Sequence, residues 1–336
     1  MYFQTTTDET KQPNNTDNPD VVEHTIHQYT TDITEVVDQT QAKIVSILSG
    51  EEDSQKQQSG VIYLSNERDC YVVTYLDSME EETYRVRFDN DFVMDSEVIG
   101  YDPVTGVCVL RVQPEFLTEN ITLGNSDYVS QGEYAIVMSS RNIETQSSHI
   151  SFGVVTAAAQ EYKPSTDETI SPAIASVLYS DVMTNDQCLG APLCNIAGDM
   201  IGMVTQVNRG VGTMSEVLGI SEVKLIVEQF IQQSSLTREY LGVIGRNIEE
   251  MEIYEKSSYS SQLDITEGFL ITHMEEDSPL ASLGGVVGDV IVAINEEPVN
   301  NLLNLREQLY SLGEEGPIVV SINHAGTVNN VTVRGE

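Results

Sequence analysis

Between residues 44 and 207, short apolar runs alternate with polar or glycine-rich turns. The runs are rich in β-branched residues and alternate between apolar and polar positions, a pattern typical of half-buried β-strands. The clearest runs cover residues 61–64, 71–74, 84–88, 107–112, 134–138 and 200–204. Roughly a dozen strands at such spacing predict a mainly β fold, built as a sandwich or as paired barrels.

The periodicity changes to that of a helix over residues 221–232. Ser221 can cap this helix, because its hydroxyl can accept a hydrogen bond from a free backbone amide of the first turn. The apolar residues fall on one face, which predicts an amphipathic helix; they are Val223, Ile226, Val227, Phe230 and Ile231. The polar residues 233–235 that follow suggest a domain boundary.

The last hundred residues show a different order of elements. Residues 240–243 open a strand, and further strands are predicted around 269–271, 288–295, 317–322 and 328–333. Short helices are expected from Ser278 and over residues 301–312. The chain is therefore divided into a tag remnant and flexible linker (1–30), a large β domain (31–233) and a small α+β domain (234–336).

The beginning of the chain is polar and lacks periodicity over residues 5–20, as expected of a flexible linker. Residues 1–4 (Met-Tyr-Phe-Gln) resemble the remnant of a tag-cleavage site, which predicts that the native protein begins upstream. Apolar positions within 21–37 form a short amphipathic segment. No signal peptide and no run of about 18 apolar residues is present.

The charge balance is strongly acidic, with 16 basic against 53 acidic residues and a formal net charge of −37. This argues against nucleic acid and against an acidic lipid surface as partners, because both are bound by clustered Lys and Arg. The charge either serves solubility in a salty or cell-surface setting or favours basic segments on partners. The four cysteines have no zinc-site spacing, so free buried thiols or a short-loop Cys188–Cys194 disulfide are expected, with no metal and no cofactor.

Residues 187–193 (Gln-Cys-Leu-Gly-Ala-Pro-Leu) resemble Gly-Asn-Ser-Gly-Gly-Pro-Leu, the nucleophile loop of trypsin-like serine proteases. With its neighbours, this loop makes the chain resemble the HtrA family. The segments that carry the resemblance are residues 59–62, 71–74, 100–103, 123–126, 152–155, 191–193, 202, 240–243 and 288–291. The resemblance implies a chymotrypsin-like double six-stranded β-barrel followed by an α+β PDZ domain.

The same resemblance implies that all three catalytic positions are replaced. A triad needs a hydroxyl, an imidazole and an orienting carboxylate. Leu189 occupies the serine position, Asp77 the histidine position three residues after Thr74, and Gly106 the position of the aspartate. Gln187 occupies the position of a glycine that helps to shape the oxyanion hole, whereas Gly190 is kept.

The sequence leaves two other chemistries open at this site. Cys188 could act as a nucleophile if a base lowered its pKa, but the five histidines (His24, His27, His149, His273 and His324) lie far from it in sequence. Asp77 facing Asp102 could suggest a metal site. A packed, inert thiol and a solvated acidic loop around Asp77 are the preferred interpretations.

The PDZ-like part keeps its motif. Residues Tyr240, Leu241, Gly242 and Val243 match the segment whose backbone amides receive a peptide carboxylate. Leu302 and Leu305, with Leu309, are candidate pocket walls from the 301–312 helix, or simply core residues. The expected ligand is an apolar C-terminus of a peptide or protein, with upstream basic residues favoured by the acidic surface.

These features lead to three hypotheses for function. The first is a degenerate HtrA-like protein without the triad, which binds peptides as adaptor, sensor or scaffold and is not an enzyme. The others are an active endopeptidase that uses Cys188, and a structural, oligomeric surface protein. The resemblance further implies a role in protein quality control, a homotrimer, for which 21–37 is a candidate segment, and an extracytoplasmic, membrane-anchored location without direct membrane contact by these residues.

Overall fold

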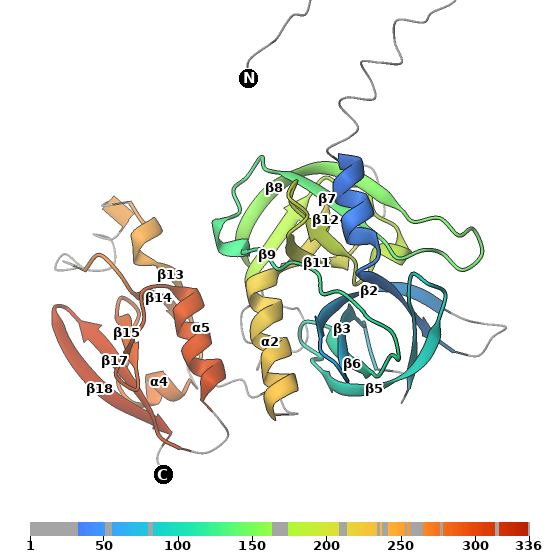
Figure 1. The fold of residues 1–336 in the computed structure, drawn as a ribbon. Helices are drawn as coiled ribbons and strands as arrows, with labels where there is room; N and C mark the ends of the chain where they lie inside the picture. The colour runs from blue at the N-terminus through green and yellow to red at the C-terminus, as the bar shows by residue number, and fades with distance from the viewer. Residues whose placement is uncertain are drawn as a thin grey trace, which may run out of the picture.

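The computed structural model describes residues 33–50, 56–79, 83–162, 174–207, 214–233, 236, 241–252, 254–255, 265–275, 278–312 and 316–334. The whole of the linker expected over 1–30, the acidic residues 80–82 and Tyr240 lie outside these ranges. The described strands form two closed barrels and a separate sheet (Figure 1). The mainly β fold with paired six-stranded barrels is confirmed, and the sandwich alternative is wrong.

The first barrel closes in the strand order β1-β2-β3-β6-β5-β4. Its strands are β1 (Ile44–Ser49), β2 (Lys56–Ser65), β3 (Cys70–Tyr75), β4 (Tyr84–Arg87), β5 (Val93–Tyr101) and β6 (Val107–Val112). Apolar side chains that alternate along these strands point inward, and Val45, Val72 and Leu110 have no exposed surface. The alternation in the sequence therefore comes from one packed barrel face.

The second barrel has the order β10-β11-β12-β9-β8-β7. Its strands are β7 (Tyr134–Met138), β8 (Ile150–Tyr162), β9 (Ile174–Ser180), β10 (Pro192–Cys194), β11 (Met200–Gln206) and β12 (Ser215–Gly219). Two 3₁₀ turns, η2 (Ser126–Tyr128) and η3 (Asp186–Cys188), lie in its loops. The turn η3 leads directly into β10, so the barrel positions the loop that resembles a nucleophile loop.

Helix α2 (Ile220–Gln233) follows the second barrel and packs on both barrels. Phe230 is 4% exposed, and its ring lies where a Cβ at Gly100 of β5 would stand, only 2.0 Å from the nearest ring atom. The helix expected over 221–232 is confirmed. The hydroxyl of Ser221 interacts with Asp127 at 2.9 Å and Ser126 at 2.9 Å, so its contacts tie α2 to η2.

The C-terminal unit contains a sheet in the strand order β13-β14-β15-β17-β18, and β16 pairs with β15 beside this path. Its strands are β13 (Val243–Asn247), β14 (Phe269–Met274), β15 (Val290–Ile294), β16 (Glu297–Pro298), β17 (Ile318–His324) and β18 (Thr327–Arg334). Helices α4 (Pro279–Ser282) and α5 (Leu302–Ser311) and the turn η4 (Ile248–Glu250) complete it. The expected helices near 278 and over 301–312 are confirmed.

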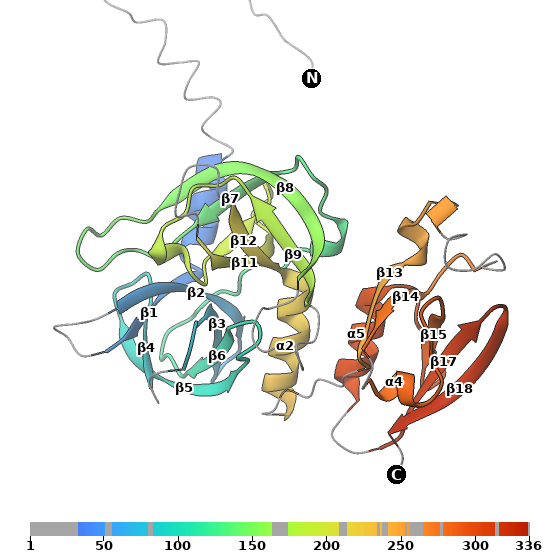
Figure 2. The ribbon, with the colours of Figure 1, turned by 180° about the vertical axis from the view of Figure 1, so that it is seen from behind.

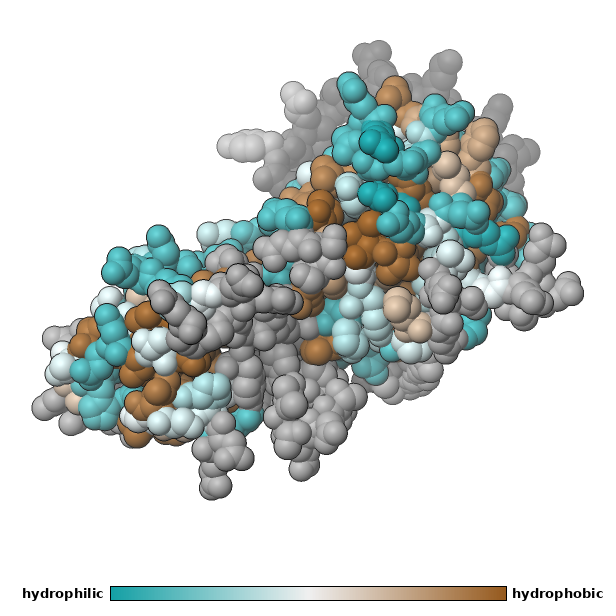
Figure 3. All heavy atoms as spheres, turned by 90° about the horizontal axis from the view of Figure 1, so that it is seen from below, coloured by the Kyte–Doolittle hydropathy of each residue, from teal (hydrophilic) through white to brown (hydrophobic). Residues whose placement is uncertain are grey.

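The barrels and the C-terminal unit lie side by side, with α2 and α5 facing each other between them (Figures 1 and 2). Residues 33–41 form a helix against the barrels, and Ile33, Val36 and Val37 pack on the core shared with α2. Seen from below, apolar side chains reach the surface between polar ones on both parts (Figure 3). None of the helices among the described residues is long and apolar enough to span a bilayer.

Candidate functional site

The loop of residues 186–191 lies against the first barrel. The Ser59 amide donates a hydrogen bond to the Leu189 carbonyl at 3.0 Å, and the Thr74 hydroxyl donates to the Ser59 carbonyl at 2.7 Å. Gly190 has φ +75°, and a Cβ there would stand 2.3 Å from the Ser59 oxygen. Only a glycine fits so close an approach in this conformation. The loop therefore sits where β2 and β3 of the first barrel meet the second barrel.

Two backbone amides of this loop, those of Gln187 and Leu189, are hydrogen-bonded within it. The Asn185 side chain caps η3 and accepts from the Gln187 amide at 3.1 Å. The Leu189 amide donates to the Asp186 carbonyl at 3.3 Å, within the same 3₁₀ turn. An oxyanion hole needs backbone amides aimed at the developing charge of a substrate. Here both amides already have partners inside the loop.

The Leu189 side chain cannot replace a serine hydroxyl. It is half-buried and packs against the apolar core of the second barrel, which includes Cys188 and Leu193. A leucine has neither a lone pair nor a proton to exchange. In this position the side chain therefore contributes packing.

Asp77 and Gly106 are brought together by Tyr75. The Tyr75 hydroxyl donates to Asp77 Oδ1 at 2.6 Å, and its ring lies 2.3 Å from where a Cβ of Gly106 would be. The Leu76 amide donates to the Gly106 carbonyl at 2.8 Å. Burial, then the hydrogen bond to Asp77, raises the pKa of Tyr75. The phenol of Tyr75 therefore lies between the carboxylate of Asp77 and Gly106.

Two side chains near the site were not singled out from the sequence. Tyr75 is one, and Glu216 of β12 is the other, whose charge adds to the raised pKa of Tyr75. Burial raises the pKa of Glu216, while hydrogen bonds from Tyr179 and Thr205 act in the opposite direction. Tyr75 belongs to the first barrel and Glu216 to the second. They come close only because the two barrels pack together, and the sequence of one strand does not predict that packing.

Cys188 is fully buried, and burial raises the pKa of its thiol to about 11. Its Sγ lies 3.5 Å from Asn185 Oδ1. The ring of His149 instead interacts with the Met183 carbonyl at 2.7 Å. All four cysteines are buried free thiols, so the Cys188–Cys194 disulfide alternative is wrong.

Asp102 lies in the turn between β5 and β6 and is 1% exposed. Its carboxylate accepts from the amides of Val104 at 3.1 Å and Thr105 at 3.2 Å, which fixes the turn that presents Gly106. Among the residues that the structure describes, no three His, Cys, Asp or Glu side chains converge as metal ligands would. The contacts of Asp102 are those of a turn-forming residue.

The predicted groove residues gather in the C-terminal unit at the edge strand β13, which pairs with β14. Gly242 has φ +67°, and a Cβ there would stand 2.1 Å from Ser278 Cβ. Leu241 is 4% and Leu305 is 3% exposed, and both belong to the core of this unit. Val243 and Leu302 are half-buried beside that core.

Two barrels with a loop of this geometry between them define the class of trypsin-like peptidase folds. A model of the trypsin-like peptidase domain matches residues 58–203. The serine protease Do-like HtrA of Lactobacillus helveticus is 24% identical over 295 residues, which is 86% of this chain and 70% of that protein. A probable periplasmic serine endoprotease, DegP-like, of Ectopseudomonas mendocina is 30% identical over 64% of this chain, but only 43% of its own length is covered.

Solved structures show the same fold. The HtrA-type protease AlgW with tripeptide superposes with a TM-score of 0.63 at 19% identity, over 89% of this chain and 95% of that one. The serine endoprotease from Yersinia pestis gives 0.56 at 18%, with the same coverage of both chains. The chain is thus similar to HtrA-type proteases and shares their trypsin-like peptidase fold. Its relatives are named as serine proteases or endoproteases.

Proposed function

We propose that this chain is a catalytically inactive HtrA homologue that binds the C-termini of peptides or proteins. We assign Asp77, Gly106 and Leu189 to the triad positions, and these three residues supply no imidazole to accept a proton and no hydroxyl to attack a carbonyl. The proposal depends above all on the backbone amides of Gln187 and Leu189, which donate to Asn185 and Asp186 within the loop and are therefore not available to an oxyanion.

The rival function, a cysteine endopeptidase, lacks a nucleophile at neutral pH. A thiol with a pKa of about 11 is roughly one part in a thousand thiolate at pH 8. Cys188 has no exposed surface, so a substrate carbonyl could not reach its sulfur. The geometry of Cys188 therefore supports inactivity.

We assign the binding role to the C-terminal unit as a PDZ domain spanning residues 234–336. Its β13 is an edge strand, to which an extended peptide can add as a further strand. The loop at Leu241 and Gly242 would receive the carboxylate, and α5 would flank the last side chain. The ligand class is an apolar C-terminus with basic residues upstream, bound more tightly at low salt because the chain carries a charge of −37.

A peptide pair tests the binding function. A fluorescent peptide with an apolar C-terminal residue and a free carboxylate is expected to bind with micromolar affinity, and the same peptide with a C-terminal amide at least about tenfold more weakly. Leu302→Ala should weaken binding, whereas Asn304→Ala, on the same helix turn, should not. Equal binding of acid and amide, or no binding across a library of C-termini, would reject the assignment.

The remaining roles follow from the relatives. Location outside the cytoplasm agrees with the name of the DegP-like relatives as probable periplasmic proteins. A homotrimer, a membrane anchor and a part in protein quality control belong to the same proposal. Sedimentation of the intact chain tests the trimer directly.

A further inference from the structure

Three apolar side chains reach the surface of the first barrel, in the turn between β4 and β5 and in the segment that follows β6. Phe92 is 61% exposed and Leu117 is 100% exposed. Phe116 is half-buried and packs on the core of this barrel. The centroid of its ring lies 5.4 Å from that of Phe92 and 5.1 Å from that of the buried Phe88. Phe92, Phe116 and Leu117 together form an apolar surface, the aromatic patch.

The backbone beneath the aromatic patch is held by hydrogen bonds. In the turn, the Phe88 amide donates to the Phe92 carbonyl at 2.9 Å, and the Asp91 amide donates to the Phe88 carbonyl at 3.0 Å. In the segment after β6, Asn120 Oδ1 accepts from the Ser65 amide at 2.6 Å. An apolar surface that is already ordered loses little conformational entropy when a partner covers it. The aromatic patch is therefore prepared for a contact.

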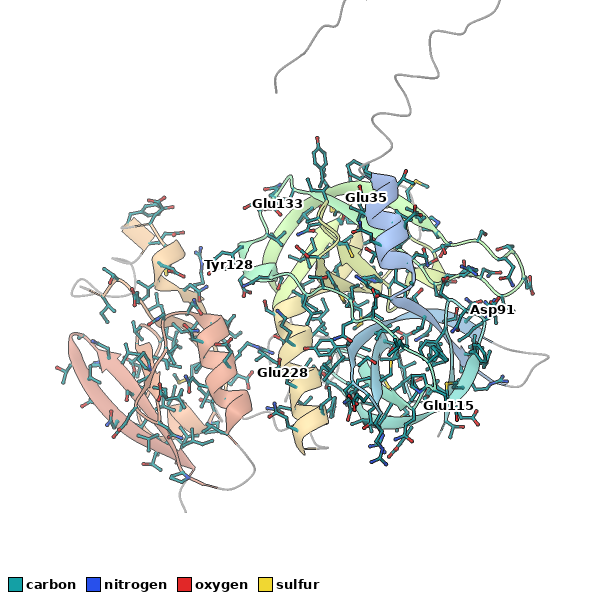
Figure 4. All side chains as sticks on the ribbon, in the orientation of Figure 1. Glu35, Asp91, Glu115, Tyr128, Glu133 and Glu228 are labelled. Atoms are coloured by element: carbon teal, nitrogen blue, oxygen red, sulfur yellow. The ribbon has the colours of Figure 1, made fainter. Side chains whose placement is uncertain are left out.

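The charges around the aromatic patch are negative. Residues 88–95 and 113–120 contain five acidic and no basic residues. The five are Asp89, Asp91, Asp95, Glu115 and Glu119. Asp91 and Glu115 lie on the side of the first barrel that is turned away from the C-terminal unit (Figure 4). A partner would thus meet apolar rings within a negative field, far from the proposed peptide groove.

This charge decides which partner fits. A second copy of the chain, with its formal net charge of −37, would be repelled. Residues 1–32 contain six acidic residues and one basic residue, Lys11, so this segment is disfavoured for the same reason. Anionic lipid would be repelled as well. Lys and Arg side chains are attracted, and their charged groups also bind the faces of aromatic rings.

We propose that the aromatic patch docks a basic segment of a partner protein. An apolar side chain of that segment covers the rings of Phe92 and Phe116, and its Lys or Arg side chains pair with the exposed Glu115 and Glu119. The inference does not rest on the binding function proposed above, because the C-terminal unit takes no part in it. The aromatic patch is small, so the contact is weak and transient.

A synthetic peptide tests this surface on the intact chain. The probe is a short fluorescein-labelled peptide of lysine and serine with two phenylalanines, and its C-terminal amide offers the groove no carboxylate. We expect a Kd of about 10–100 µM at low salt. Binding should be about tenfold weaker when serine replaces the phenylalanines or glutamate replaces the lysines. No binding at about 1 mM peptide would overturn the proposal.

Serine variants locate the binding surface. Phe92→Ser and Leu117→Ser should each weaken binding by at least about fivefold, and both side chains are exposed enough to be replaced without loss of the fold. The matched control is Ile196→Ser on the second barrel, where Ile196 is 59% exposed, and it should leave binding unchanged. Equal losses in all three variants would show that the peptide follows the overall charge and not the aromatic patch.

A charge reversal distinguishes docking from misfolding. Glu115→Lys combined with Glu119→Lys keeps the rings, and it should weaken binding of the lysine peptide while the glutamate peptide binds more tightly than to wild type. A misfolded variant would bind both peptides less, and unchanged selectivity would contradict the proposal. Binding of wild type to phosphatidylcholine vesicles that Phe92→Ser abolishes would assign the aromatic patch to lipid instead, and would also overturn it.

Discussion

Gly190 fixes the conformation of the loop that carries Leu189. Its positive φ and the close approach of Ser59 and Thr74 press the loop onto the first barrel. The heptapeptide frame assigns Leu189 to the serine position, because the flanking Gly, Pro and Leu keep their spacing, and this assignment stays a prediction. The hydrogen bonds that occupy the amides of Gln187 and Leu189 depend on the folded loop. In the sequence, only Asn185, two residues before Gln187, indicates a side-chain cap there.

Alanine substitution at two glycines separates the cost of backbone strain from the cost of steric overlap. Gly190→Ala should lower the free energy of unfolding by about 2–4 kcal/mol, because the Cβ would overlap the Ser59 oxygen in a left-handed backbone. Gly132 has φ +90° and nothing within 4 Å, so Gly132→Ala should cost only about 1 kcal/mol. Urea denaturation measures both, and equal losses would show that the loop can move aside.

The cysteine thiols should be unreactive in the folded protein. Burial raises the pKa of Cys188 to about 11 and those of Cys108 and Cys194 to about 12, so little thiolate exists at pH 8. We expect iodoacetamide to modify no cysteine in native protein and all four in urea, as counted by mass spectrometry. Rapid native labelling of Cys188 would revive the cysteine-protease alternative.

At the scale of elements, strands and helices were largely predictable because each follows a local period. Alternation located β3, β6 and β7, and the helical period located α2. What the sequence did not predict were contacts between distant elements. Ser221 was expected to cap α2, but its hydroxyl interacts with Asp127, 94 positions away. The tertiary contact sets its role, and no local pattern reports it.

Glu216 on β12 makes the free energy of unfolding depend on pH. Burial is the main cause of its raised pKa, so the folded state binds this proton more tightly than the unfolded state. The stability gained from the protonated form is present below pH 4.5 and is lost as the pH rises through the folded-state pKa.

Glu216→Gln should therefore raise the free energy of unfolding at pH 7, with the gain shrinking toward pH 4. The exposed Glu115 (Figure 4) provides a control, because Glu115→Gln should show no such trend. Urea titrations over this pH range measure the difference. A Glu216→Gln gain that grows as the pH falls would contradict the burial of its charge.

At the scale of the whole molecule, two barrels are followed by a smaller unit that meets them where α2 contacts α5, and a buried ion pair joins Glu222 to Arg306 there. The order of barrels followed by a smaller α+β unit was predictable from the order of motifs along the chain. The Glu222–Arg306 pair was not, since neither residue stands out in sequence and their pairing depends on how α2 meets α5. The central claim for the molecule is that the site between the barrels has lost its chemistry.

Hydrolysis of casein and of fluorogenic peptides by concentrated protein tests that claim most directly. We expect no turnover above buffer for wild type, for Cys188→Ala, or for Leu189→Ser, because a new hydroxyl would still lack both a base and an oxyanion hole. An active HtrA protease assayed in parallel confirms the substrates. Turnover by wild type that copurifies with the protein and disappears in Cys188→Ala would contradict the account.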